Sequence, residues 1–227
     1  MPRIENFIGQ YQDNSTLVNF SQPAITFTRI GDNKFIFNGS QYQDKYADGD
    51  IAQIPKIIGT TARESAPLVP YPINNYTAGP SEELVYTRTL STVCAAYNTS
   101  VLRDESHLVT YRYQWAGNFS NINGQVPWLG AYHYSDLYMF FGTYPIAPGE
   151  ISEFEVQTAA NMQDLLYDFV ADPSCLPSNG WPEFHATDPS GGQLARFGAH
   201  GQALQIVDGN DVDGACHIPG AVYDTTP

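Results

Sequence analysis

Positive charge is scarce in this sequence. Lysine and arginine number 10 against 24 aspartate and glutamate residues, which gives a formal net charge of −14. A field of that sign repels nucleic acid and disfavours an anionic membrane surface. Long apolar runs are missing too, since no stretch approaches the ~18 apolar residues that a membrane-spanning helix needs. We therefore expect no nucleic-acid partner and no membrane span.

Cysteine is rare as well. The chain has three, Cys94, Cys175 and Cys216, and no two of them form a C-x-x-C pair. That spacing argues against a zinc site and against a redox dithiol, so we expect no metal and no cofactor. One disulfide with one remaining thiol would fit an oxidising compartment.

What is present is typical of a globular protein. The hydrophobic fraction is 42%, and 15 Tyr, 12 Phe and 3 Trp can fill a sizeable aromatic core. A length of 227 residues suffices for one large domain or for a good part of one. The first stretch, to about Ser40, is polar and turn-rich with short apolar pieces, and residues 1–23 are poorly defined within it.

N-glycosylation motifs recur along the chain and suggest an exported glycoprotein. Chance in a chain rich in Asn, Ser and Thr is the alternative. The N-terminus, Met1–Glu5, has no apolar signal segment, so either the protein is not exported or its true start lies upstream. We expect a secreted, extracellular protein with six candidate sites: Asn14, Asn19, Asn38, Asn75, Asn98 and Asn118.

Strand and helix patterns alternate, which predicts an α/β fold with a mostly parallel sheet. β-Branched runs and period-two alternation predict the strands, and acidic first turns with apolar residues at helical spacing predict the helices. In the predicted helix 152–170, Ser152 and Glu155 form a capping box, and Met162, Leu165, Leu166 and Phe169 share one face. The predicted order is strand 54–61, helix 81–97, strand 108–115, a loop and short helix within 130–142, helix 152–170, and strands 194–197 and 203–207.

A carboxylate and an imidazole follow successive predicted strands. Glu64 comes just after the first strand, and His133 lies in the loop that follows the second. Sites in parallel sheets form beyond the carboxyl ends of the strands. A carboxylate there can hold one ring nitrogen and stabilise the imidazolium while the other nitrogen takes a proton. Two unrelated surface residues are the plainer interpretation of the spacing alone.

Several segments resemble the type-B carboxylesterases, the family of cholinesterases, fungal lipases and fungal secreted carboxylesterases. Residues 54–64 resemble the family's strand-plus-acid motif, which usually ends Asp-Glu-Gly. Residues 129–142 resemble its Gly-Ala-x-His-x-Ser-Glu-Leu…Phe-Gly motif. Supporting matches are residues 109–113, before the histidine loop, and Asp172-Pro173 with residues 180–184, so the likeness runs from about residue 24 to about residue 216.

The resemblance implies an α/β-hydrolase fold, with the whole chain as the C-terminal portion of one type-B domain. It implies Glu64 as triad acid, His133 as general base and a small carboxylic ester as substrate. Ser135 would be a supporting hydrogen-bonding residue, with a plain turn or N-cap serine as the alternative. Cys94 and Cys216 resemble the positions of a family disulfide, with two buried free thiols as the alternative.

The departures from the family pattern concern the nucleophile. No G-x-S-x-G occurs in the chain, and the family's oxyanion-hole Gly-Gly segment is missing. The interval from Glu64 to His133 is short for the family. Arg63 and Ser65 replace the usual Asp and Gly around the acid. Ser65 is a poor nucleophile candidate because Arg63 and Pro67 stand where a tight elbow needs small residues.

We therefore expect a Ser-His-Glu ester hydrolase that keeps its acid and base but lacks its nucleophile, and so is inactive alone. A sheet that lacks its upstream strands would have an open edge and self-associate. The second hypothesis is a non-catalytic secreted interaction protein derived from a carboxylesterase. An unrelated glycoprotein with coincidental matches is the third.

Overall fold

A computed structural model describes residues 31–124 and 126–226 of the chain. These residues fall into two compact units that divide between Lys45 and Tyr46, and each is described by itself. In the first unit, the Asp32 carboxylate accepts hydrogen bonds from the backbone N–H groups of the three residues 34–36, at 2.8–2.9 Å. The motifs of the histidine and the acid lie in the second unit.

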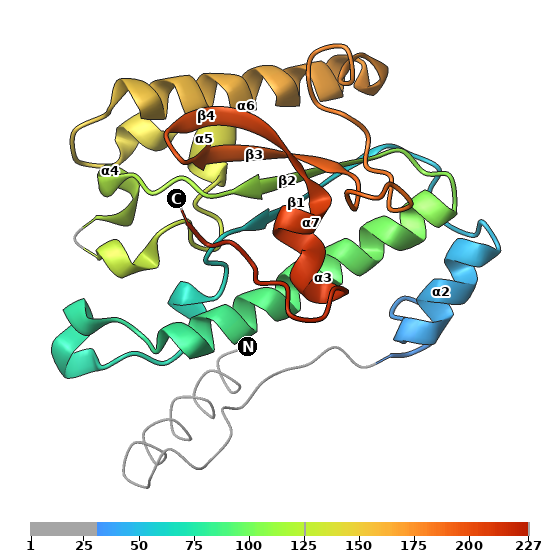
Figure 1. The fold of residues 1–227 in the computed structure, drawn as a ribbon, viewed down its shortest axis with the longest axis horizontal. Helices are drawn as coiled ribbons and strands as arrows, with labels where there is room; N and C mark the ends of the chain where they lie inside the picture. Colours follow the sequence, from blue (N-terminus) through green and yellow to red (C-terminus); the bar gives the residue numbers. More distant parts are fainter. Residues whose placement is uncertain (1–30, 125, 227) are drawn as a thin grey trace, which may run out of the picture. The chain divides into compact units, whose positions relative to one another are not determined.

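Four strands form one sheet in the order β1-β2-β3-β4. β1 and β2 run parallel, β2 and β3 run parallel, and β3 and β4 form an antiparallel hairpin (Figure 1). The sheet is therefore mostly parallel, as the element order predicted. The strands are β1 (Lys56–Thr61), β2 (Thr110–Trp115), β3 (Gln193–Ala199) and β4 (Gln202–Asp208).

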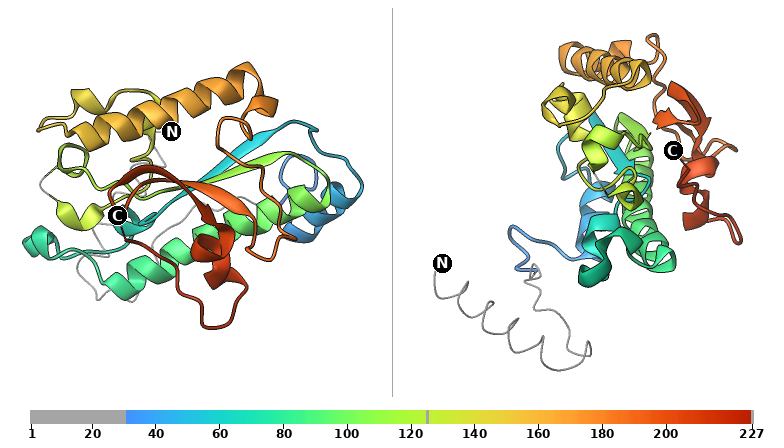
Figure 2. Two further views of the ribbon diagram at one scale, coloured as in Figure 1. Left: turned by 45° about the horizontal axis from the view of Figure 1, so that its top comes forward. Right: turned by 90° about the vertical axis from the view of Figure 1, so that its left-hand side faces the viewer.

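Helices cover both faces of this sheet, which gives three layers (Figures 1 and 2). α3 packs against β1 and β2 on one side, and α6 packs against β3 and β4 on the other. The α-helices are α2 (Gly39–Ala47), α3 (Glu82–Glu105), α4 (Ser120–Asn123), α5 (Leu137–Phe140), α6 (Glu153–Ala171) and α7 (Gly209–Asp213). Short 3-10 turns are η1 (Ala66–Leu68), η2 (Ile73–Ala78), η3 (Pro127–Leu129), η4 (Tyr144–Ile146), η5 (Pro173–Cys175) and η6 (Gly214–Cys216).

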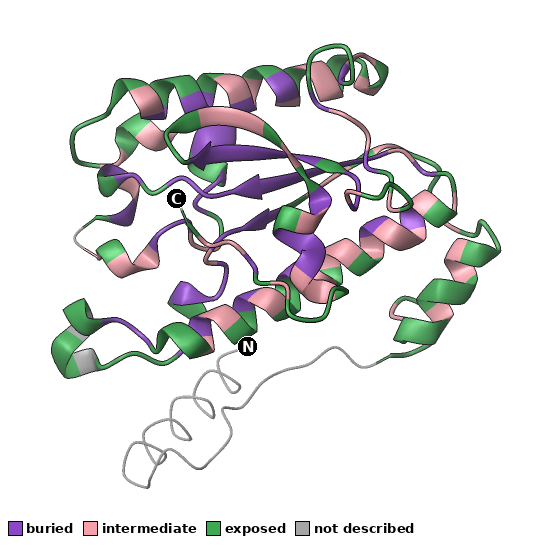
Figure 3. Cartoon of the chain, in the orientation of Figure 1, coloured by how far each residue is buried: buried purple, intermediate pink, exposed green. Residues whose placement is uncertain are grey.

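The α6 face of the sheet holds an aromatic core. β2 sends three alternate side chains into it, Tyr111, Tyr113 and Trp115, where they meet Trp181 and Phe197. Ring pairs such as Tyr113–Phe197 and Trp181–Phe197 lie edge to face with centroids 6.0 Å apart, an arrangement that the ring quadrupoles favour. β2 and β3 are accordingly buried over nearly their whole length, whereas β4 is only partly buried (Figure 3).

α6 contributes its apolar face to this core as predicted. Met162 and Leu165 are buried in the cluster, with Leu166 and Phe169 packed against it. Ser152 caps the helix by accepting a hydrogen bond from the Glu155 N–H at 3.1 Å, and Asp172 forms its C-cap. The predicted capping serine and the predicted helix end are both confirmed.

The opposite face of β2 is polar but equally buried. Arg112 donates to Asp213 of α7 at 2.8 Å and to Ser100 of α3 at 3.1 Å, so one guanidinium joins three elements. Burial raises the pKa of Asp213, although the charge of Arg112 acts in the opposite direction.

Nearby, the Cys94–Cys216 disulfide links α3 to η6 across 122 residues of sequence, while Cys175 is a free, half-buried thiol. The pairing that the family resemblance implied is confirmed.

The prediction for the long helix was wrong at its C-terminal end. α3 continues to Glu105, eight residues beyond the predicted end at Tyr97. Residues 98–105 are largely polar but stay helical, and Thr99 and Ser100 donate their hydroxyls to the carbonyls of Ala95 and Ala96, each at 2.8 Å. Propensity alone missed this because the helix is held by packing on the sheet.

The Arg112–Asp213 pair yields the first testable prediction. D213A should lower the free energy of unfolding by about 3–5 kcal/mol, because it leaves the Arg112 charge buried without its partner. Both side chains are 0% exposed. D211A, which removes an exposed carboxylate two residues earlier in the same helix, should stay within about 0.5 kcal/mol of wild type. Urea unfolding of both variants measures the difference, and equal midpoints would contradict the account.

Candidate active site

The loops after β1 and β2 lie side by side because the two strands are parallel and in register. Thr61 at the end of β1 is level with Trp115 at the end of β2. The pairing extends beyond the strands: Ala62 N–H donates to the Trp115 carbonyl at 2.8 Å, and Arg63 N–H donates to the Ala131 carbonyl at 3.0 Å. The loop that carries the acid is thereby fixed to the loop that carries the histidine.

Glu64 is oriented by its own strand. Its Oε2 atom accepts hydrogen bonds from the Thr61 N–H at 3.2 Å and from the Thr61 hydroxyl at 2.5 Å. Its Oε1 atom is thereby turned toward Nδ1 of His133, with which it is in direct hydrogen-bond contact. Glu64 is only 8% exposed, so the contact is largely shielded from water. The structure thus brings together the two residues that the sequence singled out.

His133 presents its other ring nitrogen away from the acid. A carboxylate accepts only, so the contact with Glu64 places the proton on Nδ1 and leaves Nε2 as an acceptor. Within the part of the chain that the structure describes, Nε2 has no hydrogen-bond partner, and the side chain is 31% exposed. The ring packs on Tyr134, with centroids 3.7 Å apart. An accessible basic nitrogen with its tautomer fixed is the arrangement of a general base.

Ser135 holds the loop rather than the imidazole. Its hydroxyl accepts a hydrogen bond from the Trp115 indole at 2.8 Å and donates one to the Tyr132 carbonyl at 2.6 Å. Ser65 is also buried, and its backbone N–H donates to the Thr89 hydroxyl at 3.0 Å. Neither serine hydroxyl makes a hydrogen bond to His133 among the residues described.

A second buried acid lies beneath the Glu64–His133 pair, and the sequence analysis missed it. Asp136, three residues after His133, accepts a hydrogen bond from the Tyr113 hydroxyl at 2.5 Å. Burial raises the pKa of Asp136, against the lowering effect of Tyr113, and the nearby charge of Glu64 raises it further. Burial also raises the pKa of Tyr113, again with a contribution from Glu64. The sequence did contain a signal for this acid, because Asp136 stands where the resembling histidine motif has Glu.

Gly59 explains how Tyr113 reaches that acid. Gly59 pairs with Tyr113 across β1 and β2, and a Cβ on residue 59 would lie 1.9 Å from Tyr113 Cζ. The phenol ring therefore lies over the bare backbone of β1. A larger residue at position 59 would displace the ring and with it the hydroxyl that binds Asp136.

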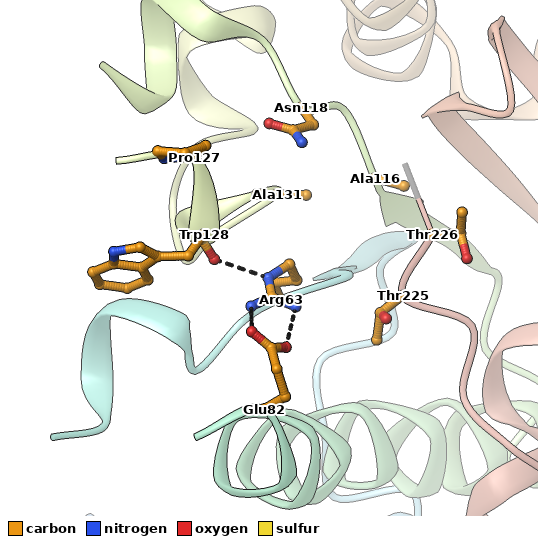
Figure 4. A pocket seen from close by; sticks show the side chains of 10 residues that line it. Arg63, Glu82, Ala116, Asn118, Pro127, Trp128, Ala131, Thr225 and Thr226 are labelled. Carbon is orange, nitrogen blue, oxygen red and sulfur yellow. Dashed lines mark hydrogen bonds and ion pairs between the residues drawn. The ribbon is translucent and has the colours of Figure 1, made fainter. Parts of the chain in front are cut away.

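Two cavities lie near the pair, but neither includes Glu64 or His133. Their volumes are about 380 and 190 Å³, and Arg63, Glu82 and Thr225 line both. Figure 4 shows the larger one, bounded by the Arg63–Glu82 ion pair and by Trp128. Because His133 lines neither cavity, neither is a substrate pocket that faces its Nε2 atom.

The described residues contain no group of three or more His, Cys, Asp or Glu side chains that could hold a metal ion. Within the same ranges, no helix combines the length and apolarity needed to cross a membrane.

The sequons at Asn14 and Asn19 lie outside the described residues, whereas Asn38, Asn75, Asn98 and Asn118 are exposed.

Comparison with known proteins supports the family. No protein-family model matches the chain. It is 32% identical over 202 residues to secreted lipase 5 of Gibberella zeae, which covers 85% of this chain and 37% of the lipase. It is also 32% identical over 210 residues to chlorogenic acid esterase of Aspergillus niger, covering 86% of this chain and 39% of that enzyme. The family resemblance found in the motifs is confirmed at this level, that of fungal carboxylesterase- and lipase-like proteins.

A solved structure supports the fold. A thermophilic PNB esterase superposes with a TM-score of 0.56 at 16% identity, covering 89% of this chain and 45% of the esterase. The α/β-hydrolase fold expected from the motifs is confirmed. The chain spans less than half the length of these relatives.

The Tyr113–Asp136 bond predicts a pH-dependent loss of stability. Because burial raises the pKa of Asp136 above its ordinary 3.8, the stability gained by protonation is present below that value and is lost as the pH rises through the raised pKa. Y113F removes a hydrogen bond that lowers this pKa. It should therefore cost about 1–3 kcal/mol at neutral pH and less in acid.

Y111F is the matched control for this prediction. Tyr111 lies on the same face of β2, is also buried, and donates its hydroxyl to the Pro173 carbonyl at 2.7 Å rather than to a carboxylate. Its cost of about 1 kcal/mol should not depend on pH. Urea unfolding of both variants at several pH values tests this, and parallel pH profiles would contradict the role given to Asp136.

Proposed function

We propose that this chain, a relative of fungal lipases and esterases, is the acid–base portion of a carboxylic ester hydrolase of the Ser-His-Glu type. The observation that carries the proposal is the contact between Glu64 and Nδ1 of His133, with Nε2 left accessible. In this assignment Glu64 is the orienting acid and His133 the general base. Ser135 supports the histidine loop through Trp115 and Tyr132.

The geometry fits the steps of acyl transfer. Nε2 of His133 takes the proton from a serine hydroxyl while the serine oxygen bonds to the ester carbonyl carbon. The imidazolium, stabilised by Glu64, then protonates the leaving alcohol as the carbon–oxygen ester bond breaks. In the second half, water gives a proton to Nε2 as its oxygen bonds to the acyl carbon. The imidazolium then returns that proton to the serine oxygen as the acyl–serine bond breaks, which releases the carboxylic acid and the free serine.

The nucleophile and the oxyanion donors would come from another segment. No G-x-S-x-G occurs in the sequence, and in the described residues no strand pairs with the second edge of β1. A parallel strand added at that edge would end beside Glu64 and His133, where sites in α/β sheets form. In this proposal the chain is the C-terminal portion of a type-B carboxylesterase domain, inactive alone, and the open edge favours self-association when that strand is missing.

Export and glycosylation belong to the same proposal. The disulfide and the secreted relative suggest an extracellular location. In two of the exposed sequons the hydroxyl donates to the asparagine side chain, Ser40 to Asn38 at 2.8 Å and Thr77 to Asn75 at 3.1 Å. Protein secreted from a eukaryotic host should lose mass on enzymatic deglycosylation, and N75Q should lose one glycan. An unchanged mass would contradict the glycoprotein assignment.

A non-catalytic interaction protein is the second candidate, favoured by the missing nucleophile motif. The two candidates differ in what His133 does. As a base, it must be required whenever a serine from a complementing segment becomes reactive. In an interaction protein, its removal would change no chemistry.

Labelling with a fluorophosphonate serine probe tests the proposal. The chain alone should remain unlabelled, whereas its mixture with the part of the Gibberella zeae lipase that it does not match should become labelled at a serine of that part. H133A should abolish this labelling. H185A is the matched control, because His185 also contacts a carboxylate, Asp104 at 3.2 Å, outside the site. A labelled serine in the lone chain, Ser65 included, would contradict the half-site. An associated mixture that stays unlabelled would favour the interaction role.

A further inference from the structure

Arg63 occupies the position next to the acid where the resembling motif has Asp. Its side chain does not point into solvent but is only 17% exposed. The guanidinium donates to both carboxylate oxygens of Glu82, at 2.7 and 2.8 Å, and its Nε donates to the Trp128 carbonyl at 3.1 Å (Figure 4). One side chain therefore binds the first turn of α3 and the beginning of the histidine loop at once.

The backbone of Arg63 contacts the same loop. Its N–H donates to the Ala131 carbonyl at 3.0 Å, and the residue forms an isolated parallel bridge with Tyr132. Ala131 and Tyr132 directly precede His133. The main chain and the side chain of Arg63 thus hold two adjacent stretches of one loop, while the next residue, Glu64, contacts the imidazole at its end.

Gly130 makes room for this arrangement. Its backbone has φ 56° and ψ −139°, a region that side chains avoid. A Cβ at this position would also lie 2.4 Å from Cδ and 3.2 Å from Nε of Arg63. The stem of Arg63 therefore packs directly on the backbone of the histidine loop, three residues before His133.

A guanidinium suits this task because of its shape. Its planar fork makes two parallel bonds to a carboxylate and keeps Nε–H for a third acceptor, which a lysine ammonium cannot do in one orientation. The hydrogen bond from Arg63, and then its charge, lower the pKa of the Glu82 carboxyl. Glu82 therefore stays ionised at neutral pH, where the clamp operates.

We propose that Arg63 is a positioning residue for the Glu64–His133 pair: clamped by Glu82 and the Trp128 carbonyl, it fixes the histidine loop against the acid loop. This inference rests on the proposed function, in which that pair is the catalytic acid and base. It assigns to Arg63 the task of keeping Nδ1 of His133 within reach of Glu64. Arg63 itself touches neither substrate nor reacting atoms.

The test compares two neighbouring glutamates. E82Q removes the carboxylate that holds Arg63, whereas E83Q removes an exposed carboxylate one residue later in the same first helical turn. The readouts are the tautomer populations of the His133 imidazole, from long-range nitrogen–proton NMR at mildly alkaline pH, and the hydrogen-exchange rate of the Arg63 amide. E82Q and R63K should mix the tautomers and raise the exchange rate several-fold, while E83Q changes neither.

A glycine pair supplies the second arm. G130A adds a Cβ against Arg63, and G124A adds one at a residue of nearly the same conformation, φ 59° and ψ −135°, with no atom within 4 Å. Both variants bear the same backbone strain, so their difference isolates the contact with Arg63. G130A should mix the His133 tautomers, and G124A should leave them as in wild type.

E64Q separates the possible failures. If E64Q mixes the tautomers and E82Q, R63K and G130A leave them unchanged, the clamp is refuted and the proposed function stands. If E64Q leaves the tautomers unchanged, the acid–base pair itself is refuted. Tautomer mixing in E82Q, R63K and G130A, but not in E83Q and G124A, supports the positioning role, because a merely structural loss would not single out His133.

Discussion

The parallel pairing of β1 with β2 is the constraint on which the site depends. Because Thr61 and Trp115 end their strands level with one another, the residues that follow leave the sheet at the same edge. An antiparallel pairing would have put the acid and the histidine at opposite ends. The hydrogen bond from the Arg63 N–H to the Ala131 carbonyl continues the pairing into the loops, so that the next residue, Glu64, contacts the imidazole of His133.

Buried polar contacts then hold the loops in place. At the end of β1, Thr61 hydrogen-bonds Glu64. At the end of β2, Trp115 hydrogen-bonds Ser135 and Tyr113 hydrogen-bonds Asp136, so both strand ends bind the loops that follow them. A buried polar group without a partner costs stability. Burial raises the pKa of Asp136, and the hydrogen bond from Tyr113 acts in the opposite direction. A site of this kind keeps its geometry only where every polar partner is present.

Much of this arrangement could be predicted from the sequence, and the rest could not for physical reasons. β-Branched runs and period-two alternation located the strands, and the 3.6-residue repeat of a buried face located α6. The end of α3 was misplaced because tertiary packing outweighs the weak preference of a polar run. Arg63, Tyr113 and Asp136 escaped notice as partners because their contacts depend on side-chain directions across strands, which spacing does not encode. The disulfide came from family resemblance alone.

The central claim is that this chain by itself holds His133 in contact with Glu64. Proton NMR in water tests it most directly, since an Nδ1–H bound to a shielded carboxylate resonates far downfield and exchanges slowly. The account predicts such a signal in the lone chain, assigned to Nδ1 of His133 through its nitrogen and lost in E64Q with the backbone spectrum otherwise retained. A lone chain that is folded but shows mixed His133 tautomers and no such signal would contradict it.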